Sequence, residues 1–511
     1  MLAKVLSGAV IGVDGLMVEV EVDLAKGLPA FSTVGLAEGA VREAKDRVKA
    51  AIKNGGYAFP VGKITVNLAP ASVRKEGAGY DLPIALGILA AAGLVDGEKL
   101  SSGSILVIGE LSLDGTVKPV RGILSMTMAA AKKGIRRVLV PLENASEAAV
   151  IPNVKVMGVE HLSQAVEYLC GLNNIQPTAV DVHELFQYQI VHEADFEDVK
   201  GQEHVKRALE IAASGGHNIL MSGPPGSGKT MMARRLPSIL PDFTLDEALE
   251  TSKVFSTIGN LPADYPLVTE RPFRAPHHTI SDAGLIGGGQ VPRPGEVSLA
   301  HNGVLFLDEL LEFKKHVLEV LRQPLEDGIV SISRASMSLV FPARFMLAAA
   351  MNPCPCGYMG DPFHECSCSP VQIQRYRSRL SGPLMDRIDM HIEVPAVQVT
   401  ELAALQPGEN SAAIRSRVNS ARCLQKQRFA EISGVNCNAQ MRPREVTKFC
   451  KLDSVGTRLL EGAVKQLGLS ARAHNRILKI ARTVADLAGK KNIDSTSLGE
   501  AIQYRRMRYE K

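Results

Sequence analysis

Residues 223–230 read Gly-Pro-Pro-Gly-Ser-Gly-Lys-Thr, a complete G-x-x-x-x-G-K-[ST] phosphate-binding loop. The apolar run 217–222 before the loop predicts a buried parallel strand, and residues 231–240 after it predict a helix. A glycine turn between a strand and a helix N-terminus points several backbone N–H groups at one spot, where the helix dipole also favours an anion. The stretch therefore predicts an α/β domain that binds a nucleoside triphosphate. The alternative is a Gly/Pro turn that matches the pattern by chance.

The loop assigns the expected cofactors, ATP and Mg²⁺, to particular side chains. Lys229 would neutralise the β- and γ-phosphates, and the Thr230 hydroxyl would bind Mg²⁺. The candidate nucleotide-binding residues of the loop are Gly223, Pro224, Pro225, Gly226, Ser227, Gly228, Lys229 and Thr230.

Two later apolar runs end in residues that suit hydrolysis. The run 303–307 ends in Asp308, which could order Mg²⁺, and Glu309, which could polarise the attacking water. A second run, 345–351, ends in Asn352, which would lie near the γ-phosphate if its strand lay between the other two. The alternatives are a strand that meets solvent at two acids and an asparagine that only forms a turn.

Four of the eight cysteines lie within 15 residues, as two C-x-C pairs: Cys354, Cys356, Cys366 and Cys368. Four thiolates could close a tetrahedral structural zinc site with no open position for catalysis. The C-x-C spacing is tighter than the usual C-x-x-C, and His364 could replace one ligand. Inert or redox-active thiols are the alternative.

Composition points to a soluble, cytoplasmic protein of about three domains with no membrane partner. The longest apolar stretch, residues 82–95, is too short to span a bilayer. The N-terminus shows no signal peptide, and eight cysteines without one indicate a reducing compartment.

Charge is distributed unevenly along the chain. Residues 411–511 hold 21 Lys and Arg against 8 Asp and Glu, a net charge of +13, which leaves −9 for residues 1–410. A basic block is a surface that nucleic acid could use. Equally, it could be a solvated helical surface, or its arginines could be committed to nucleotide and subunit contacts.

The hydrophobic pattern divides the chain into blocks. The first contains expected strands at 17–22, 63–67 and 105–108 and expected helices at 40–53 and 82–92. The predicted blocks are 1–172, a linker at 173–195, the ATPase block 196–395, a helical connection at 396–440 and a C-terminal helical block at 441–511.

Longer motifs resemble a known family. The two acids and the strand-end asparagine resemble an AAA+ ATPase, and the magnesium-chelatase-like branch is indicated by residues 273–278, 287–289, 294–303 and 352–357. Within that branch the sequence resembles the ComM/YifB family along essentially its whole length, with Leu311 standing where the family usually has proline. The resemblance implies an α/β multidomain fold with a Lon-protease-like (ribosomal S5-like) α+β domain, an AAA+ domain and a helical domain. It also implies a hexameric ring that unwinds DNA and promotes branch migration during natural transformation, with recombination or competence proteins as partners.

The resemblance also implies roles for several arginines. Arg387 would be a finger that reaches the γ-phosphate of a neighbouring subunit, and Arg472 would contact nucleotide. Their competitors are Arg375, Arg377, Arg379 and Arg476. Residues 329–341 predict a hairpin with Arg334 near its tip, and a glycine-rich loop carries Arg293; both arginines are candidates for DNA contact. A structural hairpin buried between subunits is the alternative.

The first block resembles the Lon protease domain without its catalytic groups. No serine lies in residues 75–82, where Ala78 stands near the expected nucleophile, and Leu124 stands where the protease has its lysine. A Ser–Lys mechanism cannot run without either group, so we expect no proteolysis. The alternatives to a DNA motor are a magnesium-chelatase-type motor that acts through a protein partner, a nucleotide-switched scaffold and, disfavoured, an ATP-dependent protease.

Overall fold

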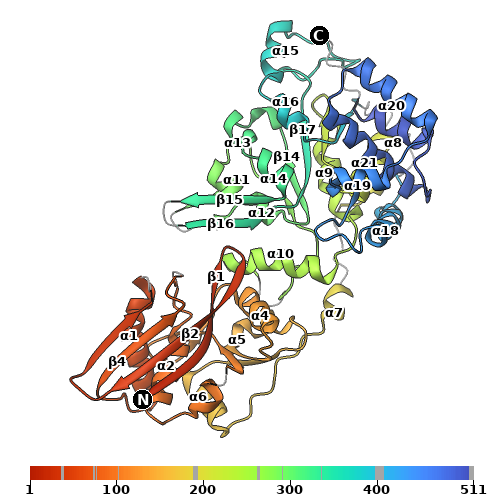
Figure 1. Cartoon of the computed structure of the whole chain (residues 1–511). Helices are drawn as coiled ribbons and strands as arrows, with labels where there is room; N and C mark the ends of the chain where they lie inside the picture. The colour runs from red at the N-terminus through yellow and green to blue at the C-terminus, as the bar shows by residue number, and fades with distance from the viewer. Residues whose placement is uncertain are drawn as a thin grey trace. The chain divides into compact units, whose positions relative to one another are not determined.

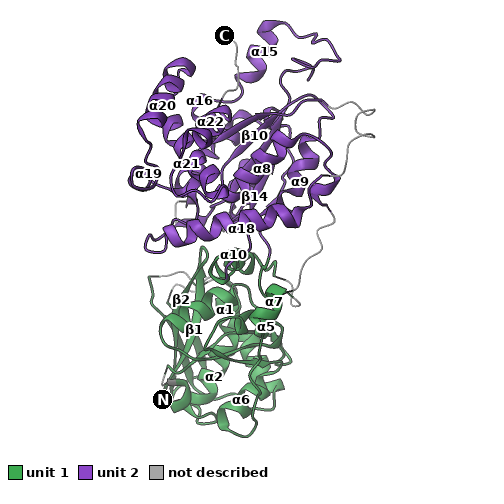
Figure 2. Cartoon of the chain, turned by 90° about the vertical axis from the view of Figure 1, so that its right-hand side faces the viewer, with its two compact units in different colours: residues 1–189, 245–269 green, residues 190–244, 270–511 purple. Residues whose placement is uncertain are grey.

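The computed structural model describes residues 1–35, 39–72, 75, 77–101, 103–187, 194–261, 265–289, 292–334, 337–396 and 408–505. The chain forms two compact units (Figure 2). Unit 1 comprises residues 1–189 and 245–269, and unit 2 comprises residues 190–244 and 270–511.

Unit 1 is built on a seven-stranded sheet in the order β3-β4-β2-β1-β5-β8-β9 (Figure 1). The strands of this sheet are β1 Leu2–Ile11, β2 Asp14–Ala25, β3 Ala30–Val34, β4 Lys63–Ala69, β5 Ile105–Val107, β8 Arg137–Pro141 and β9 Lys155–Val159, and β6 Glu110–Leu111 and β7 Val117–Lys118 form a separate two-stranded sheet. Its helices are α1 Gly39–Asn54, α2 Asp81–Ala91, α3 Gly97–Ser101, α4 Ile123–Lys132, α5 Leu142–Ala149, α6 Leu162–Cys170, α7 Val182–Gln187 and α10 Leu245–Ile258. Every residue of α2 is buried, which explains why its sequence is apolar on all faces.

Helix α10 packs within unit 1, although the sequence places it in the predicted ATPase block. Ser256 donates its hydroxyl to Glu147 at 2.5 Å, and the Gly122 N–H donates to the Ser256 carbonyl at 3.0 Å. Lys253 pairs with Asp14 at 2.5 Å. These contacts join segments far apart in the chain, so a reading of local patterns could not have placed α10.

Unit 2 contains a five-stranded parallel sheet in the order β11-β14-β17-β10-β18. Its strands are β10 Ile219–Ser222, β11 Phe273–Arg274, β14 Val304–Leu307, β17 Met346–Met351 and β18 Met390–Glu393, with the hairpins β12 Gly287–Gly288/β13 Arg293–Pro294 and β15 Ile329–Arg334/β16 Met337–Pro342 beside it. Every residue of β10, β14 and β17 is buried, as expected for parallel strands covered on both faces. Strand β17 lies between β14 and β10, the order that would bring Asn352 close to the loop.

Unit 2 also contains the following helices. They are α8 Glu203–Gly215, α9 Lys229–Ile239, α11 Asp282–Ile286, α12 Glu296–Leu299, α13 Lys315–Glu319, α14 Arg322–Asp327, α15 Pro370–Arg377, α16 Gly382–Met385, α18 Ser411–Arg428, α19 Pro443–Phe449, α20 Ser454–Leu467, α21 Ala471–Leu487 and α22 Ser495–Gln503, with 3₁₀ turns η1 Phe196–Asp198, η2 Leu310–Glu312 and η3 Asn438–Gln440. Helices α18 and α21 lie beside α8 (Figure 1). They share one hydrophobic core with the sheet, in which Leu209, Val418 and Ile480 are fully buried.

The mixed α/β, multidomain fold predicted from the sequence is confirmed. The expected hairpin at 329–341 is also present, as β15 paired antiparallel with β16. Across the described ranges, no helix is both long and apolar enough to cross a membrane.

Candidate ATPase site

The phosphate-binding loop connects β10 to α9 and depends on glycine at defined positions. Gly226 and Gly228 have φ of 76° and 88°, in the left-handed region that favours glycine. At Gly223 a Cβ atom would lie 2.1 Å from the Val394 carbonyl oxygen, so no larger residue fits. The loop geometry therefore requires the glycines that the sequence singled out.

Lys229 is buried at the centre of the loop, with 8% of its surface exposed. Its ammonium donates to the carbonyl oxygens of Gly223 and Pro224, both at 2.7 Å, and lies 3.4 Å from Asn352 Oδ1. Burial lowers the pKa of Lys229 from 10.5 to about 8, although the Asp308 carboxylate opposes this shift. The ammonium is thus held by neutral carbonyls at the position where phosphates would supply negative charge.

Asp308, at the end of β14, faces the start of α9. The Thr230 hydroxyl donates to Asp308 Oδ2 at 2.7 Å. A hydroxyl and a carboxylate at this separation are oxygen ligands of the kind that Mg²⁺ prefers, directly or through water. The donor set fits the magnesium ion expected from the sequence.

Glu309 adopts a left-handed backbone conformation, with φ of 49°. Such a conformation is unusual for a glutamate, and strained residues of this kind cluster at functional sites. Its carboxylate is 59% exposed and lies 3.4 Å from His278 Nδ1. The carboxylate is open to a water molecule and is oriented by one neighbour.

His278 is a residue whose role the sequence analysis did not identify. It follows β11, the neighbour of β14 in the sheet, and its ring also lies edge-on to Phe313 at 6.4 Å. In the sequence, the one sign of such a residue is the adjacent pair His277-His278 shortly after Arg274. The pairing of His278 with Glu309 could not be predicted, because it depends on β11 lying next to β14 in the sheet.

Comparison with known proteins shows which family the chain resembles. The family model described as magnesium chelatase, subunit ChlI, matches residues 195–402, with subunit ChlI of Mg-chelatase at 20–144 and the ChlI C-terminal model at 408–505. The competence protein ComM of Haemophilus influenzae is 44% identical over 509 residues, 99% of this chain and 98% of its own length. YifB of Escherichia coli is 44% identical over 501 residues, 97% and 96% of the two chains. The magnesium-chelatase 38 kDa subunit of Rhodobacter capsulatus is 28% identical over 177 residues, 31% of this chain and 50% of its own.

The chain belongs to the ComM/YifB family of magnesium-chelatase-like proteins. This membership confirms the resemblance seen in the sequence motifs and supports an AAA+ ATPase, with the magnesium-chelatase model covering residues 195–402. Loop, acids and strand-end asparagine occur together in this ComM/YifB protein because three adjacent parallel strands end at the same edge of one sheet.

The arginines proposed for nucleotide contact lie in different environments. Arg387 is 7% exposed, donates to the Pro383 carbonyl oxygen at 2.8 Å and pairs with Glu326. Arg472 is exposed at the start of α21. Arg476 pairs with the buried Asp389, whose pKa it holds below the usual range, against the effect of burial. Of Arg387, Arg472 and Arg476, Arg472 is the one whose side chain is exposed in the single chain, and the competitor Arg375 is exposed as well.

The other competitors and the DNA candidates are placed as follows. Arg377 donates to the Pro353 carbonyl oxygen at 3.1 Å, and Arg379 to the Leu311 carbonyl oxygen at 2.7 Å. Arg293 is exposed on β13. Arg334 ends β15, and its side chain lies outside the described part of the structure.

Many cations of the basic C-terminal block form ion pairs with carboxylates of unit 2. Ion pairs hold Arg415, Arg417, Arg428, Arg476, Arg482 and Lys490. Exposed cations remain on α19, α20 and the turn between them: Arg444, Lys448, Lys451, Arg458 and Lys465. The charge available to a polyanion is therefore smaller than the sequence count suggests.

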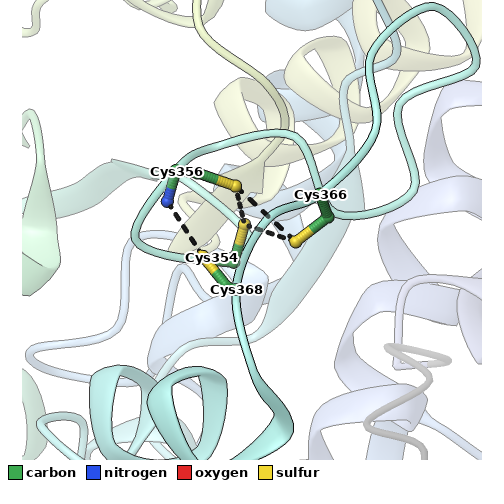
Figure 3. Close-up of side chains that lie close together, drawn as sticks. All are labelled: Cys354, Cys356, Cys366 and Cys368. Carbon is green, nitrogen blue, oxygen red and sulfur yellow. Dashed lines mark hydrogen bonds between the residues drawn. The ribbon is translucent and has the colours of Figure 1, made fainter.

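The structure also brings together the four clustered cysteines (Figure 3). Their sulfur atoms all lie within 4.8 Å of one another, a grouping that could bind a metal ion. His364 Nδ1 instead lies 3.4 Å from Asp361, and its ring lies tilted against the Tyr358 ring, with the centroids 4.8 Å apart.

Proposed function

We propose that this ComM/YifB protein is an ATP-hydrolysing motor that acts on DNA, assembles as a homohexameric ring and promotes branch migration in recombination or natural transformation. The observation that supports ATP hydrolysis is that Lys229, Asp308 and Asn352 lie together at the phosphate-binding loop. Its cofactors are ATP and Mg²⁺, with zinc in the cysteine cluster.

The site residues suit an in-line attack of water on the γ-phosphorus. Thr230 and Asp308 would hold Mg²⁺, which neutralises charge on the β- and γ-phosphates. Glu309 would accept a proton from the attacking water while Asn352 orients it. The bond from the γ-phosphorus to the bridging oxygen breaks, and the charge that develops on ADP is stabilised by Lys229 and by the N–H groups of the loop.

The proposed finger would require a second subunit. In the single chain Arg387 is paired with Glu326, so its guanidinium can reach a neighbouring active site only when that pair opens. An arginine supplied in trans couples hydrolysis to assembly, since a lone subunit lacks the arginine's contribution to charge stabilisation in the transition state.

Three observations support DNA as the substrate on which the motor acts. The family resemblance implies it, and a relative of near-identical length carries the name competence protein. The exposed cations on α19 and α20 and Arg293 on its glycine-rich hairpin could contact phosphates without reading bases.

The second candidate is a chelatase-type motor that acts on a protein partner. It is favoured by the 28% identity, over 177 residues of this chain, with the magnesium-chelatase 38 kDa subunit of Rhodobacter capsulatus. Such a motor would hydrolyse ATP at the same site, but DNA would not change its rate.

The test is the steady-state ATPase rate with and without forked and four-way-junction DNA at low salt. Stimulation by DNA that Lys229→Ala and Glu309→Gln abolish supports the proposal. Arg293→Ala should reduce stimulation and leave the DNA-free rate intact, whereas Arg136→Ala, which removes an exposed arginine of unit 1, serves as its matched control. A DNA-free rate that no DNA changes would refute the DNA motor and leave the ATPase and the chelatase-type candidate standing.

A further inference from the structure

Four sulfur atoms converge just beyond the strand that carries Asn352 (Figure 3). Cys354 Sγ lies 3.3 Å from Cys356 Sγ and 3.6 Å from Cys366 Sγ, and the latter two are 3.6 Å apart. Cys354 is fully buried, and the other three are partly buried. All four cysteines are free thiols.

The spacing of the sulfurs matches one metal ion. A tetrahedral zinc ion with Zn–S bonds of about 2.3 Å requires sulfurs about 3.8 Å apart, which is close to the observed separations. Backbone N–H groups are aimed at two of the sulfurs, from Met359 to Cys354 Sγ and from Cys356 to Cys368 Sγ, both at 3.3 Å. Such N–H donors would stabilise the negative charge that thiolate sulfurs carry when they bind a metal ion.

We propose that Cys354, Cys356, Cys366 and Cys368 bind one zinc ion in a closed structural site, and that this site fixes the position of Asn352 against the nucleotide-binding loop. Sulfurs this close would leave no room for a polynuclear iron–sulfur cluster, whose iron and sulfide atoms hold the cysteines farther apart. With four protein ligands the ion has no open position, so its role is structural.

The cysteine loop touches the nucleotide-binding loop directly. At Gly357, between the two pairs, a Cβ atom would lie 2.6 Å from Pro225 Cδ and 3.9 Å from Asn352 Cγ. The Gly357 backbone is therefore in close contact with the second proline of the phosphate-binding loop. Any movement of the cysteine loop would change the space beside Asn352.

The chain segments before and after the cysteine cluster both hold it next to Asn352. Cys354 follows Asn352 by two residues, and Arg377 of α15, which begins two residues after Cys368, donates to the Pro353 carbonyl oxygen at 3.1 Å. Arg377 also contacts Met359 Sδ at 3.3 Å. A zinc ion would close a loop of 15 residues whose two ends both return to the strand-end segment, which removes chain entropy at the position where the asparagine must be held.

Metal analysis of the full-length protein tests the site without any assay of activity. We expect one zinc ion per chain, released by a mercurial reagent that modifies thiols. The double variant Cys354→Ser/Cys366→Ser should lose the metal, whereas Cys423→Ser, which changes an exposed cysteine outside the cluster, should retain it. Zinc-free wild type after purification and supplementation with zinc, iron in place of zinc, or zinc retained by the double variant would overturn the proposal.

Substitution by Co²⁺ provides a second measurement that does not depend on the folding of a variant. Wild-type protein loaded with Co²⁺ should show intense thiolate-to-cobalt charge-transfer bands and the d–d absorption of a tetrahedral site. An octahedral spectrum without charge-transfer bands would overturn the four-thiolate assignment.

The link to Asn352 rests on the proposed ATPase function and has its own test. In Cys366→Ser/Cys368→Ser, which leaves the segment next to Asn352 unchanged, we expect kcat for ATP to fall by about ten- to a hundredfold. The Kd for ADP should stay within about twofold, because ADP lacks the γ-phosphate that Asn352 faces. Loss of zinc with kcat equal to that of Cys423→Ser would overturn the link. A wild-type protein with zinc but no ATPase activity would instead refute the proposed function and leave the metal site intact.

Discussion

The buried ammonium of Lys229 makes nucleotide binding depend on pH in a way that can be calculated. Burial lowers its pKa from 10.5 to about 8, which corresponds to a destabilisation of the charged form by about 3 kcal/mol. Bound phosphates would return the pKa to above its ordinary value, because opposite charge favours the ammonium. Binding must therefore take up protons whenever the free protein holds part of its Lys229 in the neutral form.

The size and sign of the effect follow from linkage. The free protein would take up about 0.1 proton per nucleotide at pH 7, about 0.5 at pH 8 and about 0.9 at pH 9. Since the bound state holds more protons, affinity falls as pH rises, by about tenfold between pH 7 and pH 9.

Isothermal titration calorimetry with MgADP measures this uptake from the dependence of the apparent enthalpy on the ionisation enthalpy of the buffer. The control is Lys229→Arg, whose guanidinium stays charged throughout this range and should show no uptake at pH 8 and above. Uptake near zero at pH 8 in the wild type, or equal uptake in wild type and Lys229→Arg, would refute the reasoning.

Three further perturbations test other parts of the structure. Glu309→Gln removes the proton acceptor, so kcat should fall by about 10²- to 10⁴-fold with the Kd for ATP nearly unchanged; a kcat within tenfold of the wild type would exclude Glu309 as the base. Asp486→Ala leaves the buried Arg482 and the partly buried Arg428 without their shared carboxylate and should lower the free energy of unfolding of unit 2 in urea by about 3–5 kcal/mol. Its control, Glu409→Ala, breaks an exposed pair and should cost less than about 1 kcal/mol; equal losses would contradict this account. Glu147→Ala removes the acceptor of the Ser256 hydroxyl, so hydrogen exchange across α10 should speed up by about tenfold, and unchanged protection there would show that the contact does not hold the helix.

Local pattern was sufficient for several strands and helices of unit 1. The strands expected at 17–22, 63–67 and 105–108 lie within or overlap β2, β4 and β5, and the helices expected at 40–53 and 82–92 correspond to α1 and α2. These assignments succeed because side-chain periodicity and turn residues act over a few neighbouring positions.

Local sequence patterns could not predict which side chains contact residues far away in the sequence. Charge alone left open whether the basic C-terminal block is available to nucleic acid or committed to other contacts, and ion pairs such as Arg428 with Asp486 and Arg417 with Glu210 engage many of its cations. The predicted domain limits and the roles of Arg387 and Arg472 remain predictions.

By itself the sequence determined that this protein has a phosphate-binding loop, two acids after a buried strand, an asparagine after another, and four closely spaced cysteines. Each of these is a short motif whose chemistry is contained in the motif. Only the tertiary structure decided that β17 lies between β14 and β10, that His278 faces Glu309, that Gly357 packs on Pro225 and that α10 belongs to unit 1. These contacts join residues that are far apart in sequence or depend on the path of a turn, and they are fixed by how buried faces pack rather than by any local preference.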